Sequence, residues 1–166
     1  MDENIKVVTI LFTRYYDLLA LFLHFTSGRV YTHVSISLDE DSDFYYSFNG
    51  KGFRREYPHR HPISKNTRAI KLEIPTECFE KIKAKIQEFE EKREELAYSK
   101  FGVFCCLLKI PYKREKKYFC SQFVAEMLHR SGSVNLKKKP VLYTPHQLFE
   151  ELKRQQCLLK IEYCPV

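Results

Sequence analysis

Alternating apolar and polar residues predict several strands along the chain. From Tyr31 to Leu38, Val, Ile and Leu alternate with His and Ser, which indicates a strand with one apolar and one polar face. The segments from Asp43 to Asn49 and from Thr67 to Ile74 alternate too. An acidic turn joins the strand that ends at Leu38 to the strand that begins at Asp43, which favours a hairpin between these two. The run from Ile5 to Phe12 is almost continuously apolar, as in a buried strand. We expect a last strand from Cys157 to Tyr163.

Apolar residues at helical spacing predict five helices. The second is long and has one apolar face, which is typical of outer scaffolding. The fourth is expected to end at a glycine cap, and the fifth begins with the Thr-Pro pair of a capped helix start. The five segments are Thr13 to Thr26, Thr76 to Leu96, Tyr98 to Leu108, Tyr118 to Ser131 and Thr144 to Arg154.

The order of these elements favours an α+β fold. Between them, the polar segment from Phe53 to Asn66 contains two prolines and is expected to be a loop, and Ile110 to Lys117 is expected to be a basic loop. An antiparallel β-sheet packed with helices accommodates this order. The chain has 166 residues, of which 44% are hydrophobic, so a single domain over residues 1–166 is the simplest prediction.

The net charge changes the list of conceivable partners. The formal charge is +7 and the sequence pI is near 9.0. Much of the excess lies in two short runs, Lys113 to Lys117 and Lys137 to Lys139. Such runs could contact nucleic acid, an anionic membrane or a cell-wall polymer. No nucleic-acid motif accompanies them, so we favour solvated loops and predict no nucleic-acid partner.

The six cysteines are expected to be free thiols. The N-terminal residues lack the pattern of a secretory signal, and the chain contains no CxxC pair. Without export, free thiols are the default. The apolar run from Leu18 to Phe25 is too short to span a bilayer. We therefore expect a cytoplasmic protein with no stable membrane insertion.

The cysteine in the fourth predicted helix is the first candidate for chemistry. Cys120 precedes Phe123 and Val124 by three and four residues, so it shares their apolar side of the helix and is expected to be half-buried. Its place in the first turn puts it beside free backbone N–H groups and the positive end of the helix dipole, which favour a thiolate. Taken alone, a buried structural cysteine remains the more common alternative.

A cysteine nucleophile needs a base, and His33 is the best-placed of the six histidines. It lies on the polar face of a predicted strand, where the backbone holds its ring rigidly. The ring should be oriented by a third polar group, and the paired strand offers Ser47 or Asn49. A metal site at His59 and His61 lacks a third ligand in the sequence.

Two short motifs in this order resemble the permuted branch of the NlpC/P60 papain-like superfamily. They are Tyr-Thr-His-Val-Ser-Ile around His33 and Phe-Cys-Ser-Gln-Phe-Val around Cys120, with Tyr-Ser-Phe around Ser47 between them. The resemblance extends from about Val7 to Leu152. It implies a circularly permuted papain-like fold with Cys120 as the nucleophile, His33 as the general base and Ser47 in the third position.

The activity implied by this resemblance is that of a thiol-dependent hydrolase or acyltransferase. Such an enzyme cleaves an amide, ester or thioester through an acyl-enzyme intermediate and needs no cofactor or metal. The resemblance implies a peptide, peptidoglycan-derived or lipid-acyl substrate. The main alternative is a catalytically weak or inactive binding module that keeps the fold. The substrate, the acyl acceptor and the oligomeric state stay open at this point.

Overall fold

The structure is a computed structural model that describes residues 4–14, 31–39, 41–58 and 66–163. The helix predicted from Thr13 to Thr26 falls almost wholly outside these residues, as do His24, His59, His61 and Cys164.

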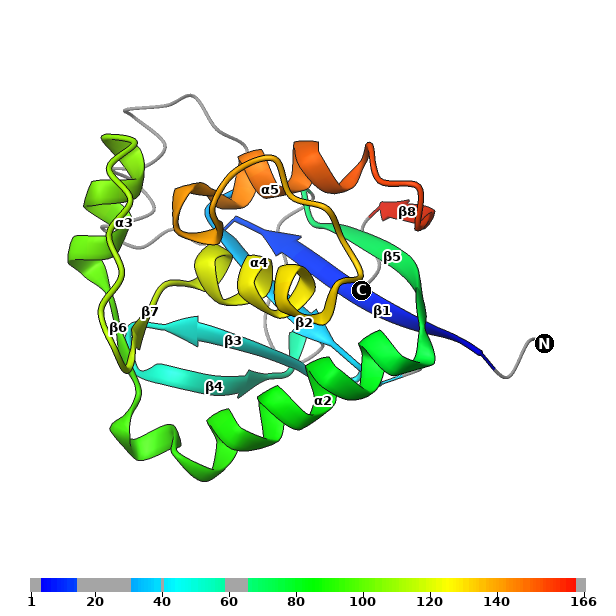
Figure 1. Ribbon diagram of the computed structural model, residues 1–166, viewed down its shortest axis with the longest axis horizontal. Coiled ribbons are helices and arrows are strands. Elements are labelled where there is room, and N and C mark those ends of the chain that lie inside the picture. The colour runs from blue at the N-terminus through cyan, green and yellow to red at the C-terminus, as the bar shows by residue number, and fades with distance from the viewer. Residues whose placement is uncertain (1–3, 15–30, 40, 59–65, 164–166) are drawn as a thin grey trace.

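A six-stranded antiparallel sheet forms the centre of the protein (Figure 1). Every strand predicted from the sequence is present in it, which confirms an α+β fold with an antiparallel sheet and packed helices. The strand order is β4-β3-β2-β1-β5-β8. The strands are β1 (Ile5–Thr13), β2 (His33–Ser37), β3 (Tyr45–Asn49), β4 (Gly52–Glu56), β5 (Arg68–Pro75) and β8 (Leu158–Tyr163).

The apolar strand β1 lies between β2 and β5. From Val8 to Thr13 it is buried, as expected for a central strand whose two faces are both covered. Its register with β2 is continuous from Thr9 opposite Ser37 to Thr13 opposite His33. In contrast, the register between β2 and β3 consists of one pair, Ile36 with Tyr46, and the two strands diverge in Figure 1. Among the strands that the structure describes, β1 alone pairs with the first residues of β2.

Strand β4 corrects the prediction of a loop from Phe53 to Asn66. The Gly-Lys-Gly sequence that seemed to end the preceding strand is instead the turn of a hairpin, in which Asn49 pairs with Gly52. Gly52 has a φ of 88°, and a Cβ there would lie 2.5 Å from the carbonyl oxygen of Leu96, so a glycine is required at this turn. The strand that follows brings Glu56 onto the sheet.

The helices follow the predicted order, with some shorter boundaries. The long helix ends at Glu91 rather than at Leu96, and the last helix ends at Leu152. Both predicted caps are present: Gly132 has a left-handed φ of 81°, and Thr144 forms a capping box with Gln147. The helices are α2 (Thr76–Glu91), α3 (Lys100–Leu107), α4 (Cys120–Ser131) and α5 (Pro145–Leu152), with 3₁₀ turns η2 (Arg93–Glu95) and η3 (Pro140–Leu142) and the short parallel strands β6 (Ala97–Tyr98) and β7 (Lys117–Tyr118).

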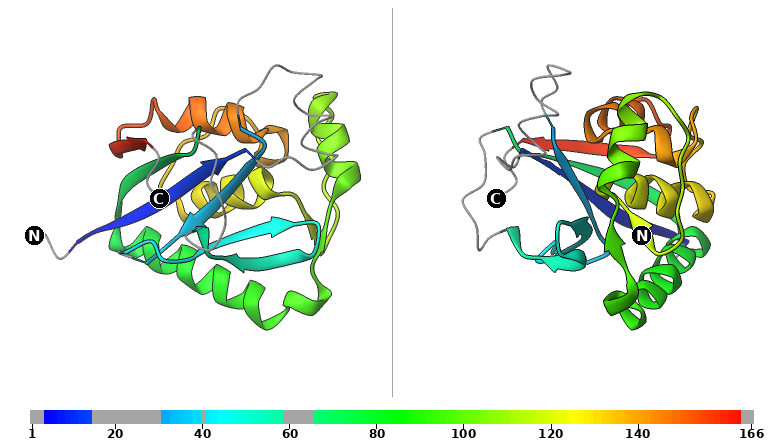
Figure 2. Two further views of the ribbon diagram at one scale, coloured as in Figure 1. Left: turned by 180° about the vertical axis from the view of Figure 1, so that it is seen from behind. Right: turned by 90° about the vertical axis from the view of Figure 1, so that its left-hand side faces the viewer.

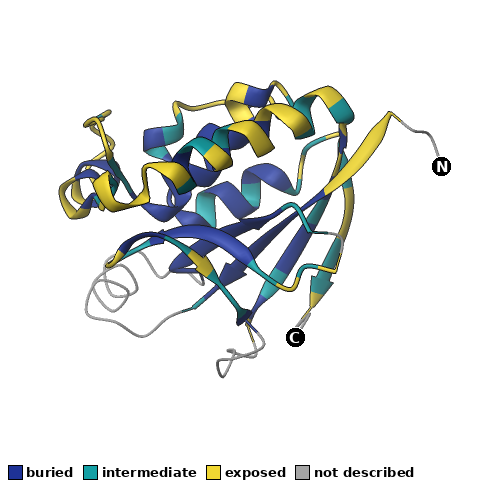
Figure 3. Ribbon diagram, turned by 90° about the horizontal axis from the view of Figure 1, so that it is seen from below, coloured by how far each residue is buried: buried dark blue, intermediate teal, exposed yellow. Residues whose placement is uncertain are grey.

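The main core lies between one face of the sheet and helices α2, α4 and α5 (Figure 2). Helix α4 packs against β2 and β3, and buried residues are concentrated there, whereas the outer face of α2 is exposed (Figure 3). An aromatic cluster joins the layers, with ring centroids 5.3 to 5.9 Å apart between Phe48, Phe53, Phe89 and Phe123. This packing fixes α4, and with it Cys120, against the diverging part of the sheet.

Candidate active site

Helix α4 begins at Cys120, directly after the extended residue Phe119. No side chain caps this helix start, and the N–H groups of Cys120, Ser121 and Gln122 precede the first helical hydrogen bond, which Phe123 N–H donates to the Phe119 carbonyl. Phe123 and Val124 are fully buried and hold the first turn against the core. Cys120 was expected to be half-buried, but its exposed fraction is only 4%. The difference arises because residues from Cys120 to Leu128 are buried on every side of the helix.

His33 is the first residue of β2, and its side chain is buried. Its Nε2 atom lies 2.9 Å from Oε2 of Glu56, which is 15% exposed. With Nε2 committed to Glu56, Nδ1 is the ring nitrogen available to a second partner. Cys120 lies beside this ring, and its side chain is close enough to raise the pKa of His33. The structure therefore brings together the two residues that the sequence singled out from opposite ends of the chain.

Glu56 occupies the position beside His33 that was expected for Ser47 or Asn49. Asn49 instead donates from Nδ2 to Oε1 of Glu56 over 3.1 Å, so it holds the carboxylate rather than the imidazole. The Ser47 hydroxyl is fully buried and forms no hydrogen bond of standard geometry with the described residues, yet it is close enough to Glu56 to lower the pKa of that carboxyl. Both residues thus support the group that contacts His33.

The site stabilises a protonated imidazole beside an ionised carboxylate. Burial by itself lowers the pKa of His33, but the charge of Glu56 and the contact with Cys120 outweigh burial, and the pKa of His33 is raised well above its usual value. Burial likewise raises the pKa of Glu56, while His33, Ser47 and Asn49 together lower that pKa to about 2.

A small cavity adjoins the Cys120 side chain. It offers about 10 Å³ to the centre of a water-sized sphere, which is room for about one water molecule. The Ser121 hydroxyl, fully buried and without a hydrogen-bond partner among the described residues, belongs to its wall. The wall consists of Thr32, Tyr98, Val103, Cys106, Phe119, Cys120, Ser121, Thr144 and Pro145. Its mainly apolar character suits an acyl group better than a charged one.

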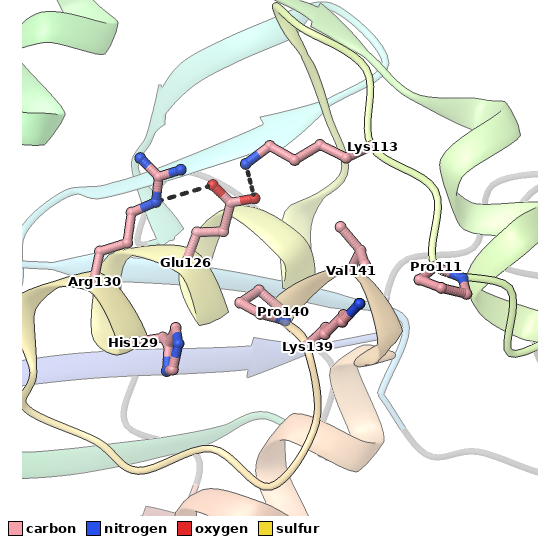
Figure 4. A pocket seen from close by; sticks show the side chains of 8 residues that line it. All are labelled: Pro111, Lys113, Glu126, His129, Arg130, Lys139, Pro140 and Val141. Atoms are coloured by element: carbon pink, nitrogen blue, oxygen red, sulfur yellow. Dashed lines mark hydrogen bonds and ion pairs between the residues drawn. The ribbon is translucent and has the colours of Figure 1, made fainter.

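A larger hollow of about 360 Å³ lies further along α4 and does not include the thiol (Figure 4). At its centre the buried carboxylate of Glu126 is 2.8 Å from Lys113 Nζ and 3.8 Å from Arg130 Nε. His129 and Lys139 also line it. Basic side chains therefore outnumber the one carboxylate, and neither His33 nor Glu56 contributes to this hollow.

Glu56 was missed in the sequence because its segment was assigned to a loop. The signal that could have found it is the short glycine-rich turn directly after a predicted strand, which is typical of a hairpin. A strand there places Glu56 on the same face as Arg54, opposite the face of the buried Phe53. Among the described residues, no group of three or more His, Cys, Asp or Glu residues is arranged to hold a metal ion.

Comparisons of the chain with protein-family models, curated proteins and solved structures gave no match. Within the described residues, none of the helices combines the length and the apolar character needed to cross a bilayer.

Proposed function

We propose that this protein is a thiol-dependent hydrolase or acyltransferase with a circularly permuted papain-like fold. The observation that carries the proposal is the buried chain of contacts from Glu56 through His33 to Cys120. A nucleophile, a base and a group that orients the base are the three parts that covalent acyl transfer requires. The order of the histidine strand before the cysteine helix supports the permuted fold.

The first half of the reaction forms an acyl-enzyme. The Cys120 thiolate attacks the carbonyl carbon of an amide, ester or thioester, and the C=O electron pair moves onto oxygen. When the tetrahedral intermediate collapses, the bond to the leaving group breaks and that group takes a proton from the His33 imidazolium. Glu56 keeps the ring in place and stabilises its positive charge before that transfer.

The second half returns the thiolate. The now neutral His33 removes a proton from water or another acceptor, whose oxygen, nitrogen or sulfur attacks the thioester carbon and releases Cys120 as the thiolate. The oxyanion that forms in both halves needs hydrogen-bond donors beside the thiol. The first-turn N–H groups of α4 and the unpartnered Ser121 hydroxyl are suitable donors.

The alternative is a binding module that keeps this fold without catalysis. One observation favours it: Cys120 is 4% exposed, and the cavity beside it holds about one water molecule. Catalysis requires the wall of that cavity to yield when an acyl group enters. The two functions therefore differ in whether a small electrophile reaches an activated thiol.

Competitive alkylation separates these functions. Limiting iodoacetamide at about pH 6, followed by mass spectrometry of every cysteine, should modify Cys120 at least about tenfold faster than Cys78 and Cys157. The latter two are more exposed, and burial raises the pKa of Cys157. An equal rate at all three cysteines would refute the enzyme and leave the binding module.

A pair of histidine variants supplies the matched control. His33→Ala should reduce the alkylation rate of Cys120 to that of the other cysteines, because the imidazolium that favours the thiolate is gone. His129→Ala changes an exposed histidine late in the same helix and should leave the rate unchanged. A panel of p-nitrophenyl esters then tests transfer itself, through the mass of an acyl group added at Cys120.

A further inference from the structure

Helix α3 is apolar on both of its faces, which is unusual for a short helix at the edge of a protein. Its inner face, with Gly102, Val103 and Cys106, is buried. Its outer face bears Phe101 and Phe104, which are 59% and 49% exposed. Figure 1 places α3 at one end of the molecule, away from the N-terminal end of β1.

The exposed apolar side chains continue beyond the end of α3. Leu108 and Ile110 are 54% and 50% exposed. Tyr112 folds back so that its ring lies 4.9 Å from that of Phe101, and Phe101 in turn lies 6.3 Å from Phe104. We refer to Phe101, Phe104, Leu108, Ile110 and Tyr112 as the α3 apolar surface. Contiguous exposed apolar side chains of this kind mark an interaction site.

The rim of the α3 apolar surface is basic. Lys100, Lys109, Lys113 and Arg114 lie within or directly after it, and the sequence from Leu96 to Arg114 contains no Asp or Glu. Lys113 also reaches the hollow of Figure 4, where further basic side chains surround Glu126. Both features give this end of the molecule a positive charge beside exposed aromatic and aliphatic groups.

We propose that the α3 apolar surface docks on an anionic lipid bilayer. Amphipathic contact with a membrane needs apolar side chains that enter the acyl boundary and basic side chains that meet the headgroups, and α3 with its following turn supplies both. The helix has eight residues and is therefore about 12 Å long, so it lies in the interface and does not span it.

Charge decides between a bilayer and a second copy of the chain as the occupant. In a two-fold dimer through this surface, each basic rim would face its own copy, and like charges would oppose each other. An anionic bilayer neutralises the same rim. The bilayer therefore satisfies both the apolar side chains and the lysines, whereas self-association satisfies the apolar side chains alone.

Docking through this face places the candidate active site close to the membrane. Val103 and Cys106, on the inner side of α3, form part of the cavity wall beside Cys120. The thickness of one helix, about 10 Å, thus separates the docked surface from the cavity. Docking itself requires no chemistry at Cys120, so the proposal stands or falls independently of the acyl-transfer function.

The absence of tryptophan from the sequence permits a direct test. Phe104→Trp introduces a single indole on the α3 apolar surface, and Tyr163→Trp introduces one at a 71% exposed position on β8. Vesicles of phosphatidylcholine with phosphatidylserine should shift the Phe104→Trp emission to the blue, and brominated lipids should quench it. The Tyr163→Trp emission should not change.

Two pairs of variants measure the apolar and basic contributions. Leu108→Ser should lower the vesicle partition coefficient about tenfold, whereas Leu159→Ser, at a 45% exposed site on β8, should not change it. Lys109→Gln should lower it about fivefold and Lys6→Gln not at all. Cys120→Ser should bind as the unmodified protein does, because docking does not use the thiol.

Three outcomes would overturn the proposal. The first is an emission of Phe104→Trp that vesicles do not alter. The second is a shift that is equal with pure phosphatidylcholine, since the basic rim would then play no part. The third is a blue shift that depends on protein concentration without vesicles, which would identify a second copy as the occupant.

Discussion

Helices α3 and α4 line the same cavity but differ in which of their side chains are buried. Helix α4 buries polar residues: Ser121, Gln122 and Glu126 are at most 4% exposed. Helix α3 does the reverse and leaves Phe101 and Phe104 59% and 49% exposed. In a folded protein, buried polar groups and exposed apolar clusters are the two informative departures from the usual distribution.

The two helices differ in where their partners lie. Several polar groups of α4 have partners within the chain, since Glu126 accepts from Lys113 and from Gln122, and Cys120 contacts His33. The α3 apolar surface is incompletely covered by the described residues. The difference indicates that α4 is built around an internal site, whereas α3 is built to meet something outside the chain.

The largest expected effect comes from removing the carboxylate of the α4 site. Glu56→Ala leaves the His33 imidazolium buried without its counter-charge, and we expect a loss of about 3–5 kcal/mol in the free energy of unfolding. Urea unfolding followed by circular dichroism measures it. The same variant should also slow the alkylation of Cys120, because the pKa of His33 falls.

Glu90→Ala is the matched control. It removes an ion pair of Glu90 with Arg55 whose partners are 29% and 46% exposed, so its cost should stay within about 1 kcal/mol. If both variants lost the same free energy of unfolding, the ion pair at His33 would contribute no more than a surface ion pair does. The contrast between an internal site at α4 and an external face on α3 would then fail.

The ion pair of Glu56 with His33 should also make stability depend on pH, and the free energy of unfolding should change by about 3 kcal/mol. The folded-state pKa of Glu56 is depressed to about 2, so its contribution is complete above the pKa of the unfolded chain and is lost as the pH falls toward 2. The pKa of His33 is raised, so its contribution is complete below about pH 6.5 and is lost as the pH rises through the folded value.

Urea midpoints at intervals from about pH 2 to pH 9 test this window. The pair contributes fully between about pH 5 and pH 6.5, and the difference between the natural chain and Glu56→Gln should be largest there. A difference that stays constant across the whole range would show that Glu56 and His33 are not coupled as their contact indicates.

The sequence predicted most elements because their patterns are local. The alternation in β2, the glycine cap after α4 and the Thr-Pro start of α5 each depend on a few neighbouring residues. The strand β4 was missed because two glycines and a lysine can form the turn of a hairpin or can end a strand before a loop. The pairing of Asn49 with Gly52 shows that the turn belongs to a hairpin, and such pairing is visible in the folded structure alone.

The candidate site could be predicted in part for the same reason. Cys120 and His33 have local signals, a helix start and a polar strand face, whereas the contact of His33 with Glu56 crosses 23 positions of the sequence. The exposure of one face of α3 was also beyond the sequence, because apolar residues occur on both faces of this helix. Which face of such a helix is covered depends on the packing around it.

The smallest expected effect on stability comes from Gly102, where α3 packs closely against its neighbours. A Cβ at Gly102 would lie 2.6 Å from Ser99 Oγ and 3.2 Å from the Phe119 ring, and Ser99 caps the helix by accepting from the Gly102 N–H over 3.1 Å. Gly102→Ala should therefore cost about 1–3 kcal/mol and increase amide exchange in α3. Gly50→Ala, where a Cβ meets no atom within 4 Å, should cost less than about 0.5 kcal/mol. If both variants lost the same free energy of unfolding, the close contact at Gly102 would not stabilise α3, and the inner face of the helix would be loosely packed.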